Sequence, residues 1–387
     1  MLNKYLFKLT HISLLQFFVV LLQKFSFNNK QIRTLLEILS TQNRKLPSYE
    51  YAIQYLNKLN PDSKNSAIKK HPLQNNDYTY DLKIIVAAYN AEDTIEECVD
   101  SILNQKTRYS LIVEIIDDGS TDSTKQILNK YTNRHNVIVT SQKNQGFSGA
   151  RNTGLKTINA SYLCFVDSDD ILKDCFAEVL LDKAFAKKAD IIAGGYQQFD
   201  NSGVISEFYY QNKNQFDPYE LYGYPWGKIY NSALFTEVTF PVDYWFEDTM
   251  LIYLVYDQSQ IVCTVKDIVY RYRRNPRGIT AISATKLKVI DSLWVTRQLL
   301  SDRQKLNLGF NEGIYKVTLQ QMCTNFIRFR FLSGQVKRAT FVIQRQIIND
   351  YFENFRFKEN GYLKNIEKAI KSNNYLAFTV YVYTGKF

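Results

Sequence analysis

The sequence is poor in the residues that build most metal centres and covalent cross-links. Among its 387 residues there are three histidines and five cysteines, and no two cysteines have a Cys-x-x-Cys spacing. This composition disfavours a histidine-rich metal site, a zinc knuckle and a disulfide framework. It is typical of a reducing compartment, so we expect a cytoplasmic protein.

Long hydrophobic runs are also scarce. The run LTHISLLQFFVVLLQ, between Lys8 and Lys24, has 15 residues and includes His11, Ser13 and Gln16. A membrane-spanning helix needs about 20 apolar residues, and no small-residue cleavage site follows the run. Two placements stay open for it: a helix in the headgroup region of a membrane, and a helix packed against the protein body.

Negative charge is scarce at both ends of the chain. Residues 1–80 contain 11 Lys and Arg against 4 Asp and Glu, and residues 281–387 contain 17 against 7, whereas residues 81–280 contain 20 against 27. No nucleic-acid-binding motif accompanies the basic flanks, so no nucleic-acid partner is expected. Peripheral contact with an anionic membrane and simple solvation of charged helices remain equal alternatives.

Three regions are expected from the patterning. Residues 1–80 are predicted to form a helical N-terminal extension and a linker, with Ser48 capping a helix that ends before Pro61. Residues 81–280 form a central α/β domain. After residue 281, helical spacing returns, for example at Leu319, Met322, Cys323 and Phe326, which predicts a helical C-terminal region over 281–387.

Within the central region, apolar runs of strand length alternate with helical patterns. The runs are LKIIVAAY, LIVEIID, VIVTSQ, ASYLCFVD and ADIIAGGY. This alternation predicts a mainly parallel sheet covered by helices on both faces, with ligands bound at the carboxyl ends of the strands.

Acidic residues crowd directly after one of these runs. Asp167, Asp169 and Asp170 fall within four positions. Such oxygen donors suit a hard divalent cation, Mn²⁺ or Mg²⁺, which would in turn hold a diphosphate. A solvated helix cap is the alternative for an Asp-x-Asp pattern alone.

Three further polar motifs are candidates for a site. NQGFSGARNTGL, residues 144–155, runs into a helix with Arg151 able to pair an anion, although its glycines could instead only shape a turn. Asp118 either caps a helix or accepts hydrogen bonds from a nucleobase or ribose. Glu247 and Asp248 lie among aromatics, where burial raises a carboxyl pKa and favours a general base.

Taken in order, these motifs resemble family 2 glycosyltransferases of the GT-A fold, over residues 82 to about 280. The motifs are VAAYNAEDTIEECVDSILNQ, IIDDGSTDST, NQGFSGARNTGL, FVDSDD, PWGKIY and FEDTM. The resemblance implies a GT-A catalytic domain over 81–280 and an inverting transfer from a nucleotide sugar, with UDP as the expected nucleotide.

The resemblance also implies roles for individual residues. The nucleotide-sugar site would comprise Ala87, Tyr89, Asp118, Asn144, Arg151, Asp167 and Ser168. Asp169 would bind the divalent metal, and Asp248 would act as catalytic base. The acceptor site would comprise Trp226, Lys228 and Glu247.

Two departures from the family pattern concern the nucleotide. Ala87-Ala88-Tyr89-Asn90 replaces the usual Pro-x-Tyr-Asn, and Gly278 replaces the serine of a terminal Ser-Ile-Thr in YRYRRNPRGIT. That stretch resembles a loop that closes over the diphosphate. Arg273, Arg274 and Arg277 are its candidate phosphate contacts, with exposed loop arginines as the alternative.

The expected function is therefore cell-surface glycan synthesis from the cytoplasmic side, at the inner face of the cell membrane. A glycan, glycoprotein or lipid-linked molecule would be the acceptor. A non-catalytic glycosyltransferase-like subunit that scaffolds a partner enzyme is the alternative. The full set of mutually repelling acids argues against it, because a site without catalysis has no physical need for them.

Overall fold

A computed structural model describes residues 45–71, 78–275, 278, 283–358 and 361–384. The N-terminal apolar run, with His11, and the predicted phosphate contact Arg277 lie outside the described residues. The chain divides into two compact units. One, the sheet unit, comprises residues 65–276 and 301–308, and the other, the helical unit, comprises residues 1–64, 277–300 and 309–387.

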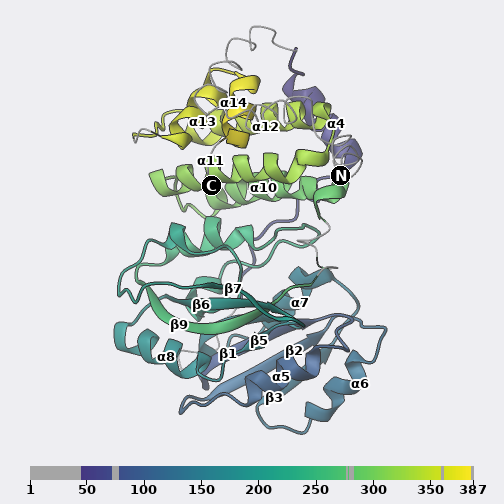
Figure 1. Cartoon of the computed structure of the whole chain (residues 1–387), viewed down its shortest axis with the longest axis vertical. Coiled ribbons are helices and arrows are strands. Elements are labelled where there is room, and N and C mark those ends of the chain that lie inside the picture. Colours follow the sequence, from purple (N-terminus) through teal and green to yellow (C-terminus); the bar gives the residue numbers. More distant parts are fainter. Residues whose placement is uncertain (1–44, 72–77, 276–277, 279–282, 359–360, 385–387) are drawn as a thin grey trace. The chain divides into compact units, whose positions relative to one another are not determined.

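The sheet unit is built on one mixed sheet (Figure 1). Its strands are β1 (Tyr80–Ala88), β2 (Leu111–Asp117), β3 (Val137–Ser141), β4 (Ala160–Asp167), β5 (Ile171–Leu172), β6 (Ile191–Asp200), β7 (Gly203–Phe208), β8 (Lys228–Asn231) and β9 (Val262–Arg273). They lie in the order β3-β2-β1-β4-β8-β6-β9-β5, with β7 paired to β6. β1 to β4 are parallel, β8 is antiparallel to β4 and β6, and β9 is parallel to β6. The predicted α/β fold is confirmed.

Helices cover both faces of this sheet, as the alternating pattern predicts. The helices are α5 (Ile95–Leu103), α6 (Thr124–Leu128), α7 (Gly146–Gly154) and α8 (Phe176–Lys187). Successive strand side chains point to opposite faces. Ile84 and Val86 of β1 pack in one core with α5, α6 and α8. Ile85 lies between them in sequence and faces α7, where a Cβ added at Gly154 would approach its side chain within 2.5 Å.

Three strands end at the same edge of the sheet. The parallel register pairs Ala88 of β1 with Asp117 of β2, and Ala87 of β1 with Asp167 of β4. Segments that follow these strands are therefore neighbours although they lie far apart in the sequence. This edge is where ligands bind in open α/β sheets.

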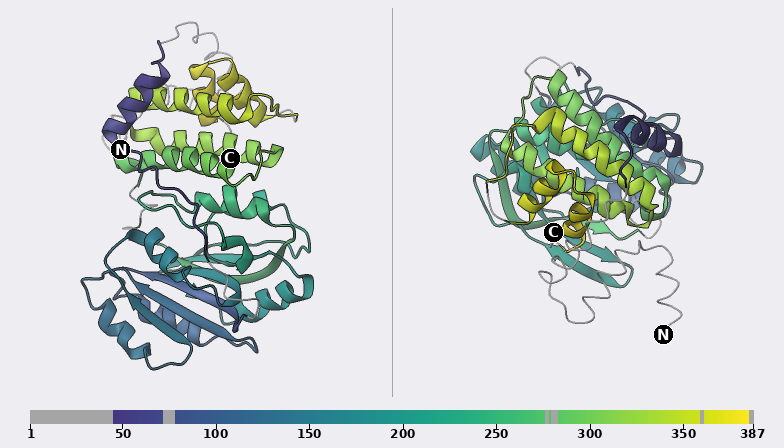
Figure 2. Two further views of the ribbon diagram at one scale, coloured as in Figure 1. Left: turned by 180° about the vertical axis from the view of Figure 1, so that it is seen from behind. Right: turned by 90° about the horizontal axis from the view of Figure 1, so that it is seen from above.

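The helical unit consists of α4 (Tyr49–Leu59), most of α10 (Asp291–Lys305), α11 (Glu312–Arg328), α12 (Gly334–Phe352), α13 (Tyr362–Lys371) and α14 (Tyr375–Thr384). Ser48 caps α4 by accepting a hydrogen bond from Tyr51 N at 3.2 Å, as predicted. Helix α12 lies against α4 (Figure 2). The C-terminal spacing pattern is confirmed, since Leu319, Met322, Cys323 and Phe326 of α11 are all buried.

Part of the predicted linker is instead built into the sheet unit. Ile68 forms a β-bridge with Val238, and Ala67 is fully buried with its N–H donated to Asp302 Oδ2 at 2.7 Å. The composition of this segment did not reveal the pairing. A search for membrane spans over the described helices found none with the length and hydropathy to cross a bilayer.

Candidate active site

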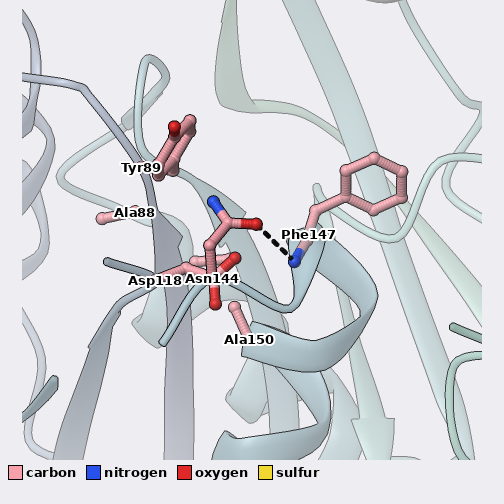
Figure 3. A pocket seen from close by; sticks show the side chains of 8 residues that line it. Ala88, Tyr89, Asp118, Asn144, Phe147 and Ala150 are labelled. Carbon is pink, nitrogen blue, oxygen red and sulfur yellow. Dashed lines mark hydrogen bonds between the residues drawn. The ribbon is translucent and has the colours of Figure 1, made fainter. Parts of the chain in front are cut away.

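A cavity of about 270 Å³ opens at the shared edge of the sheet (Figure 3). It is lined by Ala87, Ala88, Tyr89, Asp118, Asn144, Gly146, Phe147 and Ala150. β1 supplies the first residues of this set, the segment after β2 supplies Asp118, and the start of α7 supplies the last. The structure thus brings together four residues that the sequence assigned to nucleotide-sugar binding: Ala87, Tyr89, Asp118 and Asn144.

Asp118 lines this cavity. Its side chain is buried, and Oδ1 accepts hydrogen bonds from Gln142 Nε2 at 2.7 Å and from Gln145 N at 2.9 Å. Oδ2 is also buried and has no hydrogen-bond partner among the described residues. A buried carboxylate oxygen without a donor is costly, so this atom indicates a place for a ligand N–H or O–H.

Backbone geometry holds the two sides of the cavity together. Gly119 has φ +77°, and a Cβ there would lie 3.0 Å from Asn144 N. Only glycine accepts both this backbone conformation and this close approach. Asn144 Oδ1 in turn accepts a hydrogen bond from Gly146 N at 3.2 Å, which shapes the start of α7 (Figure 3).

The three clustered aspartates after β4 have different environments. Asp170 is fully buried and accepts hydrogen bonds from Tyr270 Oη and Arg273 N, each at 2.7 Å. Asp169 Oδ2 accepts a hydrogen bond from Asn275 Nδ2 at 3.1 Å. Burial, followed by the charge of Asp167, raises the pKa of Asp169. Asp170 is therefore held by hydrogen bonds within the protein, while the negative charges of Asp167 and Asp169 repel each other.

These two carboxylates fit a divalent cation. Within the described ranges, no group of three or more His, Cys, Asp or Glu side chains is placed to hold a metal ion. Mg²⁺ and similar ions are, however, commonly held by one or two carboxylates, with substrate phosphates and water as the other ligands. The mutual repulsion of Asp167 and Asp169 is what such a cation relieves. The donor set therefore fits a metal that is completed by a diphosphate.

Arg151 of α7 bridges two acids from distant parts of the sequence. Its Nη2 donates to Asp167 Oδ1 at 2.8 Å, and its Nη1 pairs with Glu247 Oε1. The guanidinium is buried near the rings of Phe240 and Phe147. Burial opposes its charge, but the carboxylates of Asp167 and Glu247 prevail and raise its pKa. Arg151 was predicted to pair an anion, and the structure gives it two protein carboxylates.

The predicted base follows a strained turn. Phe246 has φ +65°, an uncommon conformation for a bulky residue and one that is concentrated at functional sites. Glu247 is buried; desolvation raises its pKa to about 8, against the lowering effect of Arg151 and with a further increase from Asp248. Asp248 is half-buried, and its charge also acts on Arg151 and Lys228, so these groups lie in one electrostatic neighbourhood. A π-helical turn, Leu251–Val255, follows.

The predicted acceptor residues Trp226 and Lys228 lie beneath the surface. Both side chains are buried. Lys228 Nζ donates to Tyr224 O at 2.8 Å and lies 3.2 Å from the centre of the Tyr222 ring. Burial lowers the pKa of Lys228 well below its usual value, although Asp248 opposes this. These two residues can shape a site floor from below rather than line it.

The stretch YRYRRN behaves differently from the closing loop that the sequence suggested. Residues Tyr270 to Arg273 form the end of strand β9. Arg273 packs on the aspartate cluster, with Nε donating to Asp169 O at 2.8 Å and Nη2 pairing with Glu97. Arg274 is exposed. Arg273, a predicted phosphate contact, is thus occupied by protein acids. The roles of Tyr270, Arg273 and Asn275 as partners of the acids were not predicted, although the alternation of this stretch is a strand signal.

Comparison with known proteins agrees with this geometry. Residues 83–244 match the family model for glycosyl transferase family 2. This segment is a glycosyltransferase family 2 segment. The family 2 segment contains the cavity, the aspartate cluster and Arg151, whereas Glu247 and Asp248 follow directly after it.

Two curated relatives illustrate the similarity. Glycosyltransferase GlyA of Streptococcus pneumoniae is 31% identical over 292 residues, which cover 69% of this chain and 41% of GlyA. The poly(ribitol-phosphate) beta-glucosyltransferase of Bacillus spizizenii is 33% identical over 174 residues, 41% of this chain and 27% of that protein. The chain thus spans about two fifths of GlyA.

The structural comparison supports the fold. S. aureus TarS 1-349, solved in complex with UDP-GlcNAc, superposes with a TM-score of 0.51 at 18% sequence identity, covering 78% of this chain and 90% of that chain. At this identity the likeness establishes a shared fold and no more.

Proposed function

We propose that this chain is an inverting, divalent-metal-dependent glycosyltransferase that transfers a sugar from a UDP-sugar to a hydroxyl of a glycan or lipid-linked acceptor. The observation that carries the proposal is the buried Oδ2 of the cavity residue Asp118, which has no hydrogen-bond partner in the part of the chain that the structure describes, together with a neighbouring carboxylate pair that fits a metal diphosphate. A nucleotide sugar supplies both a base N–H for the first feature and a diphosphate for the second.

The cavity is the proposed nucleoside site. Asp118 Oδ2 would accept a hydrogen bond from the base, and Tyr89, whose side chain is 50% exposed, lies at the same cavity. Asn144 would contact the nucleoside from the start of α7. The shared fold of TarS, which was solved with UDP-GlcNAc, supports a UDP-linked donor.

Asp167, Ser168 and Asp169 would hold the diphosphate end. Asp169, helped by Asp167, would bind Mn²⁺ or Mg²⁺, and a bound cation there would stabilise the negative charge that develops on the leaving diphosphate. Ser168 lies on the same turn, which is anchored by the hydrogen bond that Thr94 Oγ1 donates to Ser168 O at 3.1 Å. Arg274 and Arg277 remain proposed phosphate contacts.

Asp248 is the proposed general base. It would accept the proton of the acceptor hydroxyl as that oxygen forms a bond to the anomeric carbon and the bond from that carbon to the diphosphate oxygen breaks. Attack from the side opposite the leaving group inverts the configuration, and no covalent enzyme intermediate is needed. Arg151, which pairs with both Asp167 and Glu247, would keep the base-bearing turn in register with the metal ligands.

The acceptor and the location of the reaction belong to the same proposal. Trp226, Lys228 and Glu247 would shape the acceptor site from beneath its surface. The relative that is named for glucosyl transfer to poly(ribitol phosphate) supports a cell-surface polymer as the product. The basic flanks support work at the inner face of the cell membrane.

Titration of UDP in the presence of Mn²⁺ tests the donor site. Asp118→Asn replaces one of the two carboxylate oxygens by an NH₂ group. We therefore expect UDP to bind at least about tenfold more weakly than to the wild type. Asp174→Asn, which changes an exposed aspartate paired with Lys106, is the matched control and should bind UDP normally. Equal affinity of all three proteins would remove Asp118 from the donor site. Manganese-dependent release of UDP from a UDP-sugar then separates an enzyme from a scaffold.

A further inference from the structure

An aromatic stack adjoins the aspartate cluster, and of its rings only Trp226 has been given a place in the proposed acceptor site. Trp226 stacks with Tyr224, with ring centres 4.8 Å apart and planes 6° apart, and with Tyr272, at 5.2 Å and 16°. Tyr224 and Tyr272 are themselves 6.2 Å apart and 19° from parallel. Tyr270, which bonds Asp170, stacks on Trp226 as well, at 4.6 Å and 6°.

These distances place Tyr224 and Tyr272 side by side. Carbon atoms touch at about 3.5 Å, so rings on opposite faces of Trp226 would have centres about 7 Å apart or more. The observed 6.2 Å is shorter, so both tyrosines lie on the same face of the indole. Their rings are close to coplanar, and together they form a surface two rings wide with the buried Trp226 behind it.

This surface is accessible and lies beside the proposed reaction centre. Tyr224 is 37% exposed and Tyr272 is half-buried. Tyr272 immediately precedes Arg273, whose N–H donates to Asp170 Oδ1 at 2.7 Å. The charges of Asp167, Asp169 and Asp170 also act on the Tyr272 hydroxyl. The tyrosine pair therefore borders the carboxylates that would hold the metal diphosphate.

Buried contacts hold the segment that carries Tyr224 in place. Lys228 Nζ donates to Tyr224 O at 2.8 Å. The Tyr222 hydroxyl donates to Gly227 O at 3.1 Å and to Gly194 O at 3.2 Å. Gly227 has φ +68°, and a Cβ there would collide with the Tyr222 hydroxyl. A rigid aromatic surface loses little entropy when a ligand stacks on it.

We propose that the paired rings of Tyr224 and Tyr272 form a stacking platform for a pyranose ring of the acceptor, which makes the acceptor a saccharide. The inference rests on the proposed transferase function and names its acceptor class. The C–H face of a pyranose is flat and apolar and can cover two aromatic rings, while its rim of hydroxyls suits the tyrosine hydroxyls and carboxylates around it. A hydrocarbon chain would cover these polar groups without hydrogen-bonding them, which costs free energy. Lys228 acts here as a positioning residue, through the backbone of Tyr224.

Saturation-transfer NMR of the full chain with methyl pyranosides and with disaccharides of glucose, galactose and N-acetylglucosamine tests the platform directly. At least one saccharide should bind through its ring C–H protons. Tyr224→Ala and Tyr272→Ala should each weaken that binding about tenfold or more, whereas Tyr224→Phe and Tyr272→Phe, which keep the rings, should retain it. In a transfer assay, the alanine variants should raise KM for the saccharide more than they lower kcat.

Phe185→Ala is the matched control. Phe185 is 39% exposed, stacks on Tyr109 at 5.4 Å, and lies near the starts of β2 and β4, at the opposite edge of the sheet. It should bind saccharide like the wild type. UDP binding, measured in parallel, should be unchanged within about twofold in every variant and shows that each variant is folded.

Three results would overturn the platform: no saccharide of the panel binds, the alanine variants bind as well as the wild type, or octyl alcohol binds at Tyr224 and Tyr272 in place of the sugars. A wild-type chain that fails to bind UDP would instead contradict the donor proposal. The saccharide measurement needs no donor and still decides the platform in that case.

Discussion

At the scale of single residues, four acids and one arginine form a cluster beside the proposed base. Asp167, Asp169 and Asp170 are near neighbours in sequence, yet Asp170 is sealed by Tyr270 and Arg273 while the other two oppose each other. Arg151 joins Asp167 to Glu247. Each acid therefore has a separable role, and substitutions can distinguish them.

Asp248→Asn should remove the base without changing the donor site. The amide keeps the shape of the side chain but does not accept a proton, so we expect glycosyl transfer to fall by at least about 100-fold. The dissociation constant for UDP with Mn²⁺ should stay within about twofold of the wild-type value. Retained turnover in this variant would assign the base elsewhere.

Glu247 gives the protein a pH-dependent stability. Its pKa in the folded protein, about 8, exceeds its ordinary value of 4.5. Between these values the folded state retains a proton that the unfolded chain has released, so the unfolding free energy falls as pH rises from about 4.5 to about 8. Glu247→Gln should abolish this contribution.

Denaturant unfolding of the wild type and of Glu247→Gln, from about pH 5 to about pH 8, measures the difference. The stability of the wild type relative to the variant should decline steadily across this range. A difference that does not change with pH would show that Arg151 keeps Glu247 ionised throughout.

At the scale of elements, the close packing of α7 against β1 depends on one small residue, Gly154. Gly154 lets α7 approach Ile85, and a methyl group at this position would lie 2.5 Å from the isoleucine side chain. Gly154→Ala should therefore destabilise the protein by about 1–3 kcal/mol through overpacking. Because α7 carries Arg151, turnover of a UDP-sugar should fall too.

The double variant Gly154→Ala with Ile85→Ala controls this prediction. Removal of the isoleucine branch frees the space that the new methyl group needs, so the double variant should be more stable than the sum of the two single changes predicts. Simple additivity in chemical unfolding would mean that the helix does not depend on this contact.

Sequence patterns anticipated the elements better than the contacts between them. The apolar runs LKIIVAAY, LIVEIID and ASYLCFVD became β1, β2 and β4, since buried parallel strands need continuous apolar residues. The strands β5, β7, β8 and β9 and the π-helical turn at Leu251–Val255 were not anticipated. β9 is defined by its pairing with strands that lie far away in the sequence, and a local sequence pattern carries no information on that pairing.

Site prediction from sequence had the same limit. Acids, glycines and Asn144 were found because each belongs to a short motif next to a strand end. The pairing of Arg151 with Glu247 spans 96 positions, and the side-by-side contact of Tyr224 with Tyr272 joins an irregular segment to β9. Such contacts depend on the strand order of the sheet, in which β8, β6 and β9 follow β1 and β4.

At the scale of the whole molecule, α10 contributes to both compact units. Its last turn, with residues 301–308, is grouped with the sheet unit. There Arg303 is fully buried, donates to Tyr253 O at 2.7 Å and pairs with Asp257. Arg297, on the same helix, is more than one third exposed and lies 3.4 Å from Asp62.

The two arginines should therefore respond very differently to the same change. Arg303→Met leaves Asp257 without its buried guanidinium and should lower the unfolding free energy by about 3–5 kcal/mol. Arg297→Met, the control on the same helix, should change it by about 1 kcal/mol or less. Equal melting temperatures for the two variants would show that the last turn of α10 is not anchored in the sheet unit.

The lone carboxylate oxygen of Asp118 also has a consequence for donor selection. Uracil carries a hydrogen on N3 and can satisfy this atom, whereas cytosine has a lone pair at the same ring position and would meet it with repulsion. In the proposed donor site we therefore expect a uridine donor to bind more tightly than a cytidine donor, because two acceptors face to face at N3 cost more than a missing contact. The cavity would then select nucleotide sugars by whether position 3 of the base is a hydrogen-bond donor or an acceptor.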